Sequence, residues 1–241
     1  MQSDHSDEQA RIYQTQAELY DELIAAEDAD GALQLELARH AKLDGADILD
    51  VGAGTGRISR LLADKARSLT LVDRAGPMLA VARRHLQRLG TPFSVHETDA
   101  QDLPLASAGF DLAVAGWVFG HFRHWMPDGW RAEVSRAVAE MRRVVRPGGT
   151  LLVIETLGTG HEQPRKHAGL DEYFDELAAL GFDKHWIRTD YEFASVAEAV
   201  RICGAFFGPE LIATIEQRRW VRVPECTAVF VSQQPRAAFG P

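Results

Sequence analysis

The chain of 241 residues is long enough for one α/β domain with a full core and short for two, and its composition, 46% hydrophobic and 25% charged, is ordinary for a globular protein. No apolar run approaches the roughly 20 residues that span a bilayer, and the acidic, polar start of the chain is unlike a secretory signal. The net charge of −9 is concentrated in residues 1–30, which hold nine acidic residues and one basic residue. Neither this segment nor the rest of the chain contains the clustered Lys and Arg residues that bind nucleic acid, so we expect no nucleic-acid and no membrane partner.

The chain contains two cysteines, Cys203 and Cys226, which are far apart in sequence and form no C-x-x-C pair. This usage is typical of reduced thiols, and it favours a cytoplasmic protein. The sequence does not distinguish a monomer from a homodimer.

Helices and strands are expected to alternate along most of the chain. Hydrophobic spacing predicts helices at residues 11–26, 32–43, 58–66, 77–89, 130–145 and 170–180. Short apolar runs predict strands at residues 48–51, 68–72, 93–97, 110–115, 150–155, 182–191 and 225–232. This alternation predicts an α/β fold, with a Rossmann-like, seven-stranded, mostly parallel sheet and helices on both faces. The final strand lacks a crossover helix before it, so we expect it to be antiparallel and near the sheet edge.

These elements also predict how the chain is divided. Residues 1–45 are expected to form an N-terminal helical cap, residues 46–232 the main domain with a helical insert at 195–219, and residues 233–241 a tail. Gly204 and Gly208-Pro209 interrupt the insert, because glycine and proline both disfavour a continuous helix.

The first strand runs directly into the segment D-V-G-A-G-T-G at residues 50–56. Glycines at alternate positions let a ligand approach bare backbone, which is typical of a nucleotide or cofactor loop. A dinucleotide fingerprint, G-x-G-x-x-G, requires glycine at the position where this chain has Arg57. Asp50 can reach a ligand ammonium, whereas it would repel a pyrophosphate. The segment therefore favours a ligand with an amino acid moiety.

Four further segments follow this loop. They are L-T-L-V-D at 69–73, E-T-D-A-Q-D-L-P at 97–104, F-D-L-A-V-A-G-W-V-F-G-H-F at 110–122 and V-R-P-G-G-T-L-L at 145–152. Together with D-V-G-A-G-T-G, this ordered set resembles the class I S-adenosylmethionine (SAM)-dependent methyltransferases, and in particular their small-molecule, UbiE-like, type 11 subgroup. The resemblance covers roughly residues 47–155 and implies that the main domain is a SAM-binding methyltransferase domain.

The resemblance implies a set of cofactor-binding residues. Asp73 would accept hydrogen bonds from the ribose hydroxyls, Met78 would pack on adenine, and Asp99 would accept the adenine amino group. Considered without the resemblance, Asp73 also suits a helix cap, Met78 suits core packing and Asp99 suits a turn. The full predicted set is Asp50, Gly52, Ala53, Gly54, Gly56, Asp73, Arg74, Met78, Asp99, Ala100, Gln101, Gly116 and Trp117, with Tyr20 closing over SAM from the N-terminal helix.

Catalytic side chains are expected just beyond the fourth and fifth strands, where open α/β sheets bind ligands. SAM carries an activated methyl group, so alignment matters most and only some acceptors need a general base. His121 is the predicted base, although a packing role suits it as well, and Glu155 at the end of the fifth strand is expected to face the pocket. His121 and His124 are spaced as a metal pair, but no third ligand is evident, so we expect no metal site.

Substrate contacts are expected from parts of the chain outside the core. The predicted contacts are Tyr13, His124, Trp125 and Tyr173, and the aromatic residues near them favour an apolar or aromatic small molecule. The sequence thus predicts a SAM-dependent methyltransferase that acts on a small molecule by in-line displacement. The alternatives are a nucleotide (NAD)-dependent oxidoreductase, a macromolecule-directed methyltransferase and a non-catalytic binding module. The acceptor atom (O, N, S or C) is not determined.

Overall fold

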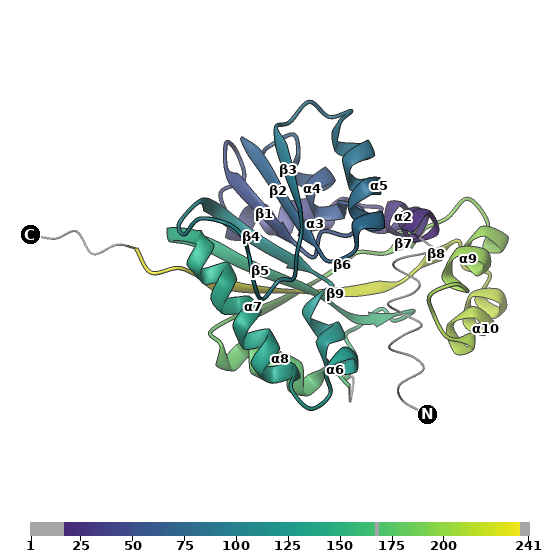
Figure 1. The fold of residues 1–241 in the computed structure, drawn as a ribbon. Coiled ribbons are helices and arrows are strands. Elements are labelled where there is room, and N and C mark those ends of the chain that lie inside the picture. Colours follow the sequence, from purple (N-terminus) through teal and green to yellow (C-terminus); the bar gives the residue numbers. More distant parts are fainter. Residues whose placement is uncertain (1–16, 167–168, 237–241) are drawn as a thin grey trace, which may run out of the picture.

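A computed structural model describes residues 17–166 and 169–236, and a seven-stranded sheet of order β3-β2-β1-β4-β5-β9-β6 lies at its centre (Figure 1). These strands are β1 (Asp47–Val51), β2 (Ser68–Asp73), β3 (Phe93–Glu97), β4 (Phe110–Gly116), β5 (Val145–Thr159), β6 (Asp183–Arg188) and β9 (Glu225–Gln233). Six of them are parallel, and β9 runs antiparallel to both of its neighbours. The prediction of a Rossmann-like, mostly parallel sheet with an antiparallel last strand is confirmed.

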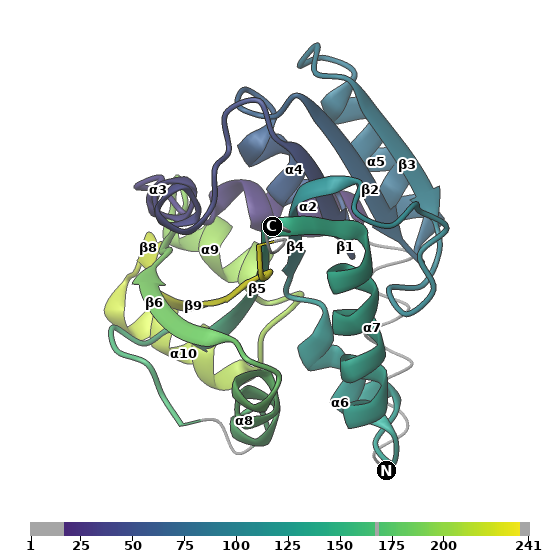
Figure 2. The ribbon, with the colours of Figure 1, turned by 90° about the vertical axis from the view of Figure 1, so that its left-hand side faces the viewer.

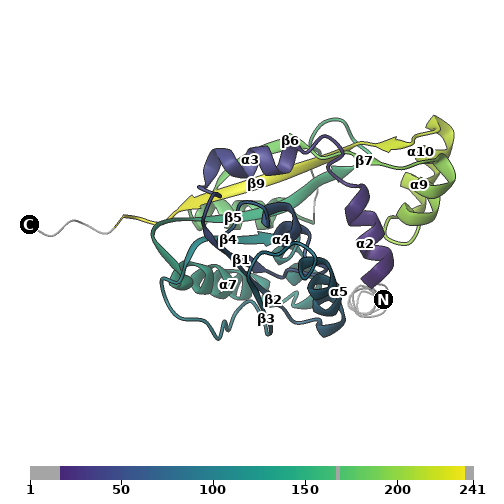
Figure 3. The same cartoon turned by 90° about the horizontal axis from the view of Figure 1, so that it is seen from above.

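Helices cover both faces of the sheet, and Figure 3 shows α3 and α7 on opposite sides of it. The helices are α2 (Ala17–Ala26), α3 (Ala32–His40), α4 (Arg57–Leu62), α5 (Gly76–Leu86), η1 (Phe119–His121), α6 (Phe122–Trp125), α7 (Trp130–Val144), α8 (Asp171–Ala179), α9 (Val196–Cys203) and α10 (Pro209–Arg218). In the part of the chain that the structure describes, no helix is long and apolar enough to cross a membrane.

The two layers follow from the alternation of side chains along each strand. On β4, Leu112 and Val114 are fully buried against α3, α4 and α5, whereas Ala113 and Ala115 are fully buried against α7 and α8. A strand that is covered on both faces needs apolar residues at every position. The continuous apolar run that predicted a central strand here therefore has a direct structural cause.

A side lobe, made of α2, α9, α10, β7 (Tyr191–Glu192) and β8 (Arg222–Val223), lies beyond one end of the sheet (Figures 1 and 2). It has a small core of its own, in which Leu23, Tyr191, Ile202, Ile215 and Val223 are buried. The two-residue strands β7 and β8 pair with each other in a separate sheet. The lobe thus brings the N-terminal helix α2 beside the helical insert.

The predicted sixth strand is wrong in extent, because the chain leaves the main sheet after Arg188 and enters β7 at Tyr191. Asp190 holds the chain at this turn. Its carboxylate accepts hydrogen bonds from both Arg188 and Arg222, and from the backbone N–H of Glu225. The two-residue β7–β8 ribbon was not predicted, since such short strands have no readable periodicity.

The fifth strand is longer than predicted. It runs to Thr159 because β9 pairs with it from Thr150 onward, so the late strand lengthens an earlier one. The N-terminal helix α3 packs in the same core cluster as α4 and α5. The division into cap, domain, insert and tail stays a prediction, and residues 1–16 and 237–241 lie outside the described residues.

Candidate active site

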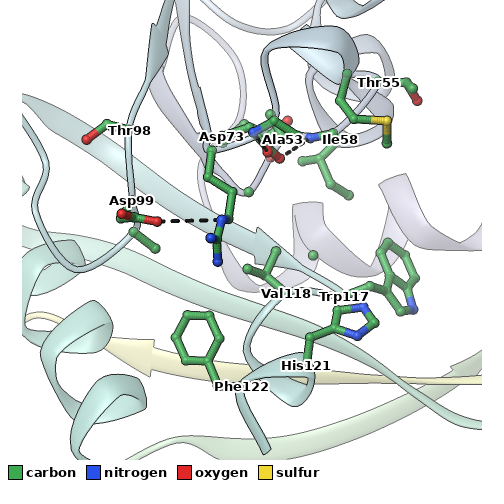
Figure 4. A pocket seen from close by; sticks show the side chains of 18 of the residues that line it. Ala53, Thr55, Ile58, Asp73, Thr98, Asp99, Trp117, Val118, His121 and Phe122 are labelled. Carbon is green, nitrogen blue, oxygen red and sulfur yellow. Dashed lines mark hydrogen bonds and ion pairs between the residues drawn. The ribbon is translucent and has the colours of Figure 1, made fainter. Parts of the chain in front are cut away.

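A cavity of about 450 Å³ opens at the carboxyl ends of β1, β2 and β4 (Figure 4). This is where open α/β sheets bind ligands, and the volume is that of a small-molecule site. Fifteen of the predicted site residues line it: Tyr20, Asp50, Gly52, Ala53, Gly54, Asp73, Arg74, Met78, Asp99, Ala100, Gln101, Gly116, Trp117, His121 and Trp125. The fold therefore brings together side chains that are more than 100 residues apart in the sequence.

The glycine loop between β1 and α4 forms one wall of the cavity. Gly52, Gly54 and Gly56 have φ values of +66°, +54° and +83°, which side-chain-bearing residues rarely adopt. A Cβ at Gly52 would collide with the side chain of Val118 on the facing wall. Gly56 lies outside the cavity lining, and a Cβ there would come within 3.1 Å of Ala82 Cβ on α5. The loop thus needs glycine for close approach at one end and for helix packing at the other.

Asp50, on β1, lines the cavity and is 1% exposed. Its Oδ2 accepts hydrogen bonds from the backbone N–H of Ser59 at 3.0 Å and from Ser59 Oγ at 2.7 Å. Burial raises the pKa of Asp50 to about 6, and the two hydrogen bonds from Ser59 oppose that shift. A buried carboxylate held in this way has a fixed orientation, which suits it to a ligand cation such as an ammonium group.

Asp73 ends β2 and holds two backbone groups at the cavity. Its Oδ2 accepts from the N–H of Gly54 and its Oδ1 from the N–H of Ala75, both at 2.8 Å. Burial raises the pKa of this carboxyl group, and the two backbone hydrogen bonds oppose the shift. Each carboxylate oxygen has a second lone pair, so Asp73 can hold the start of α5 and still accept hydrogen bonds from a ligand.

Arg74 and Asp99 face each other at the mouth of the cavity. Arg74 Nε lies 3.8 Å from Asp99 Oδ1, and a dashed line at Asp99 marks this ion pair in Figure 4. The Arg74 guanidinium also lies 5.6 Å from the centroid of the Trp125 ring. Because both charged side chains are about two-thirds exposed, their attraction is screened by solvent and their positions are adaptable.

Two buried hydrogen-bond donors of the glycine-loop wall have no partner within the described residues. They are Thr55 Oγ1 and Arg57 Nη2, and both residues line the cavity. The rest of the Arg57 guanidinium is tightly held, because Nη1 donates to Glu27 at 2.7 Å and the group stacks 3.7 Å from the centroid of the Trp117 ring. Leaving a buried donor unpaired is unfavourable, so these atoms are suited to a ligand that brings oxygen acceptors.

The facing wall consists of η1, α6 and the residues around them. The His121 ring stacks on Trp125 with 5.2 Å between the ring centroids, and His121 faces the cavity in Figure 4. Burial, with a smaller effect of the nearby His124, lowers the pKa of His121 to about 4. The imidazole is therefore neutral near pH 7 and is a weak base. Trp117 has a φ of +55°, an uncommon conformation for a bulky residue and one that often marks a functional site.

Comparison with known proteins supports the reading of the motifs. Residues 49–153 match the family model of a methyltransferase domain. These residues form a methyltransferase domain, and over them the chain is similar to the class I SAM-dependent methyltransferases.

Two relatives match this chain over part of their own length. A demethylmenaquinone methyltransferase of Thermus thermophilus is 36% identical over 110 residues, which are 45% of this chain and 46% of the relative. A malonyl-[acyl-carrier protein] O-methyltransferase of Serratia marcescens is 30% identical over 159 residues, 62% of this chain and 55% of the relative. The chain thus spans about half the length of these curated relatives.

The fold of the methyltransferase domain recurs in solved structures. The DhpI–SAH complex has a TM-score of 0.59, with 96% of this chain and 98% of that chain covered. The sequence identity is 19%, so this likeness concerns the fold alone.

Glu155 lies outside the lining of the cavity, which corrects the expectation that it faces the pocket. The side chain is buried beneath the turn that carries His121. Its Oε1 accepts hydrogen bonds from the Gly120 N–H at 3.1 Å and the Tyr173 hydroxyl at 2.8 Å. Burial raises the pKa of Glu155 to about 7, and these two hydrogen bonds oppose the shift. Glu155 is placed to position the turn, and it does not line the cavity.

Two predicted substrate contacts are also placed away from the cavity. Tyr173 is fully buried behind the turn with Glu155, because β5 and α8 close over that region. His124 is exposed on α6 and points outside the cavity lining. Tyr13 lies outside the described residues.

Several residues that line the cavity were not predicted from the sequence. They are Thr55, Arg57, Ile58, Ala75, Thr98, Val118, Phe122 and Met126. All of them except Ile58 are adjacent in sequence to a predicted site residue, so adjacency was the available signal for seven of the eight. Arg57 was read only as an argument against a dinucleotide, although its place after the glycine loop also makes it a wall residue.

Proposed function

We propose that this protein transfers the methyl group of SAM to a small-molecule acceptor. The observation that carries the proposal is the set of opposite charges in one cavity. The Asp50 and Asp73 carboxylates lie on one side of the bare glycine loop, and the unpaired donors of Thr55 and Arg57 lie along it. An amino acid zwitterion linked to a nucleoside presents the complementary groups.

Each part of SAM has a matching group among the cavity residues. Asp50 suits the ammonium group, while Thr55 Oγ1 and Arg57 Nη2 suit the carboxylate. Asp73 suits the ribose hydroxyls. Met78, Asp99, Ala100 and Gln101 form the part of the wall that suits adenine. SAM, when bound, supplies a methyl group on a cationic sulfur that is a good leaving group.

The acceptor is proposed to lie against the aromatic wall. Trp117, Phe122, Trp125 and Met126 line that side of the cavity, which favours an apolar or aromatic molecule. His121 is neutral there and, although its low pKa makes it a weak base, would take the proton from an acceptor hydroxyl, because that proton becomes strongly acidic as the oxygen bonds to carbon. Alignment of the two reactants by such walls contributes up to roughly 7–11 kcal/mol in well-oriented reactions.

Three further predictions belong to this proposal. A cytoplasmic location is supported by Cys203 and Cys226, which are both buried and unpaired as disulfides. The protein is proposed to act as a monomer or a homodimer. Residues 46–232 are proposed as the methyltransferase domain, with the N-terminal helices as its cap and residues 195–219 as an insert.

The first test is binding of S-adenosylhomocysteine (SAH), measured by isothermal titration calorimetry. We expect the wild-type protein to bind, and Asp73→Ala to weaken binding by about 1–3 kcal/mol, because ribose hydroxyls would lose their acceptor. Asp64→Ala is the matched control, since Asp64 is an exposed carboxylate outside the cavity. Absence of SAH binding at millimolar concentration would overturn the proposal, and equal affinities of the two variants would overturn the ribose assignment.

The second test identifies the acceptor class. Labelled SAM is incubated with a panel of small phenols, amines, thiols and carboxylic acids, and separately with cell lysate followed by gel analysis. Label in a small product supports the proposal, whereas label only in protein or RNA bands supports a macromolecule-directed methyltransferase. A change in NADH fluorescence on mixing, with no response to SAH, would support the oxidoreductase.

A further inference from the structure

A second group of polar side chains lies on α3 and β6, away from the cavity. Glu36 and His40 are one turn apart on α3, and His185 projects from β6 toward them. One ligand atom of each residue lies within 4.8 Å of the other two. His40 Nε2 is 2.9 Å from Glu36 Oε1, and the centroids of the His40 and His185 rings are 4.3 Å apart.

The backbone under this group is held from several sides. His40 ends α3, and its carbonyl oxygen accepts hydrogen bonds from Gln233 Nε2 at 3.0 Å and Thr150 Oγ1 at 3.5 Å. His185 is paired with Val229 in the main sheet. The three side chains are therefore brought together by two fixed elements, and small rotations of the side chains suffice to change the distances between their ligand atoms.

The carboxylate of the group is buried and is held by hydrogen bonds. Glu36 is 5% exposed. Arg39 Nη1 donates to Glu36 Oε2 at 2.7 Å, which orients the carboxylate and leaves Oε1 directed at His40. His185 is exposed, so one side of the group is open to solvent.

We propose that Glu36, His40 and His185 bind one Zn²⁺ ion. Zinc bonds of about 2.1 Å in tetrahedral geometry place neighbouring ligand atoms about 3.4 Å apart, which lies between the 2.9 Å contact and the 4.8 Å limit seen here. Two imidazoles and one carboxylate suit zinc and other late transition metals, whereas Mg²⁺ and Ca²⁺ prefer sets of oxygen ligands. Water fills the fourth position from the open side.

The site has a structural consequence that does not depend on methyl transfer. A bound ion joins the helix α3 to β6, which is an edge strand paired only with β9 in the main sheet. Because the unfolded chain does not hold the three ligands together, zinc binds the folded state in preference and stabilises it.

The experiment titrates Zn²⁺ into protein that carries no histidine tag and has been treated with a chelator, with a chromophoric zinc indicator as competitor. We expect one equivalent to bind with micromolar or tighter affinity, and His185→Gln to weaken this binding by at least about tenfold, since one of three ligands is lost. His96→Gln is the matched control, because His96 lies on β3 at the other end of the sheet. Unchanged affinity in His185→Gln, or no binding by the wild type, would overturn the proposal.

A spectroscopic measurement keeps the outcome independent of folding effects. Co²⁺ in place of Zn²⁺ should give the visible absorption bands of a four-coordinate site in the wild type and in His96→Gln, and these bands should be absent in His185→Gln. Melting temperatures in chelator check that both variants are folded. Six-coordinate cobalt spectra in all three proteins would show surface binding and overturn the assignment.

Discussion

The two walls of the cavity are built in different ways. The glycine-loop wall is held by hydrogen bonds between short acidic side chains and the backbone, as Asp73 does for Gly54 and Ala75. The facing wall around His121 is held by ring packing and by a buried carboxyl group behind it. The glycine-loop wall tolerates few substitutions, because its function depends on a particular backbone geometry and on charged side chains. The second tolerates other side chains of similar size, which suits it to the part of the reaction that differs between relatives.

The largest effect is expected from a substitution in the facing wall. His121→Ala should lower turnover with a hydroxyl acceptor by about 10²–10⁴-fold, the usual contribution of a general base, and leave SAH affinity unchanged. Steady-state kinetics and calorimetry on the same preparation separate the two quantities. His96→Ala is the control. A loss of SAH affinity equal to the loss of turnover would show that His121 acts on the cofactor side.

Glu155, behind the facing wall, makes the stability of the protein sensitive to pH. Its pKa rises from 4.5 in the unfolded chain to about 7 in the folded protein, so the folded state binds more protons between these values. Its contribution to stability is thus fully present below pH 4.5 and is lost as the pH rises through about 7. Glu155→Gln resembles the protonated acid and should keep that contribution, on the order of 3 kcal/mol relative to wild type above pH 7.

Urea unfolding at a series of pH values measures this difference directly. Tyr173→Phe sharpens the test, because removing the Tyr173 hydroxyl takes away a hydrogen bond that lowers the Glu155 pKa. The loss of stability in this variant should therefore still begin near pH 4.5 but continue to a higher pH than in the wild type. Parallel pH profiles for wild type and Glu155→Gln would contradict the assignment.

In the glycine-loop wall, a side chain at Gly52 is expected to weaken SAH binding through a steric clash. Gly52→Ala places a methyl group against Val118 and should weaken SAH binding by about 100-fold, or about 2.7 kcal/mol. Gly31→Ala is a matched control, since Gly31 has a φ of +65° and no neighbour within 4 Å of its Cβ position. It shares the backbone strain and lacks the collision. Equal SAH affinities in the two variants would argue against close approach at Gly52.

The smallest expected effect concerns a single hydroxyl. Thr55→Val replaces the unpaired Oγ1 by a methyl group of similar size. SAH binding should weaken by about 1 kcal/mol, while the ligand-free protein should become slightly more stable, because an unsatisfied buried donor is removed. Calorimetry measures the weaker SAH binding, and thermal unfolding measures the higher stability of the ligand-free protein. A loss in both quantities would indicate that Thr55 is satisfied in the free protein.

How much could be predicted from the sequence differs between the same two walls. The strands β1 to β5 and the positions of Asp50 and Asp73 were predictable, because apolar runs, glycine spacing and strand-end acids are local signals. Glu155 was misplaced because alternation along a strand does not say which face the following turn will cover. The division of residues 182–191 into β6 and β7 depends on Asp190 contacts with Arg222 and Glu225, which come from more than 30 residues away.

The position of β9 has a consequence for how the chain reaches its native state. β9 is the last strand in sequence, yet it lies between β5 and β6, so β6 has no neighbour in the main sheet until residues 225–233 are in place. During synthesis on the ribosome, β5 and β6 both emerge before the strand that joins them. Their open edges are exposed to other chains for that interval, and pairing across so long a separation is slow. Folding of this sheet is therefore completed from the carboxyl-terminal side, and a chain released before β9 is made would hold β6 unpaired.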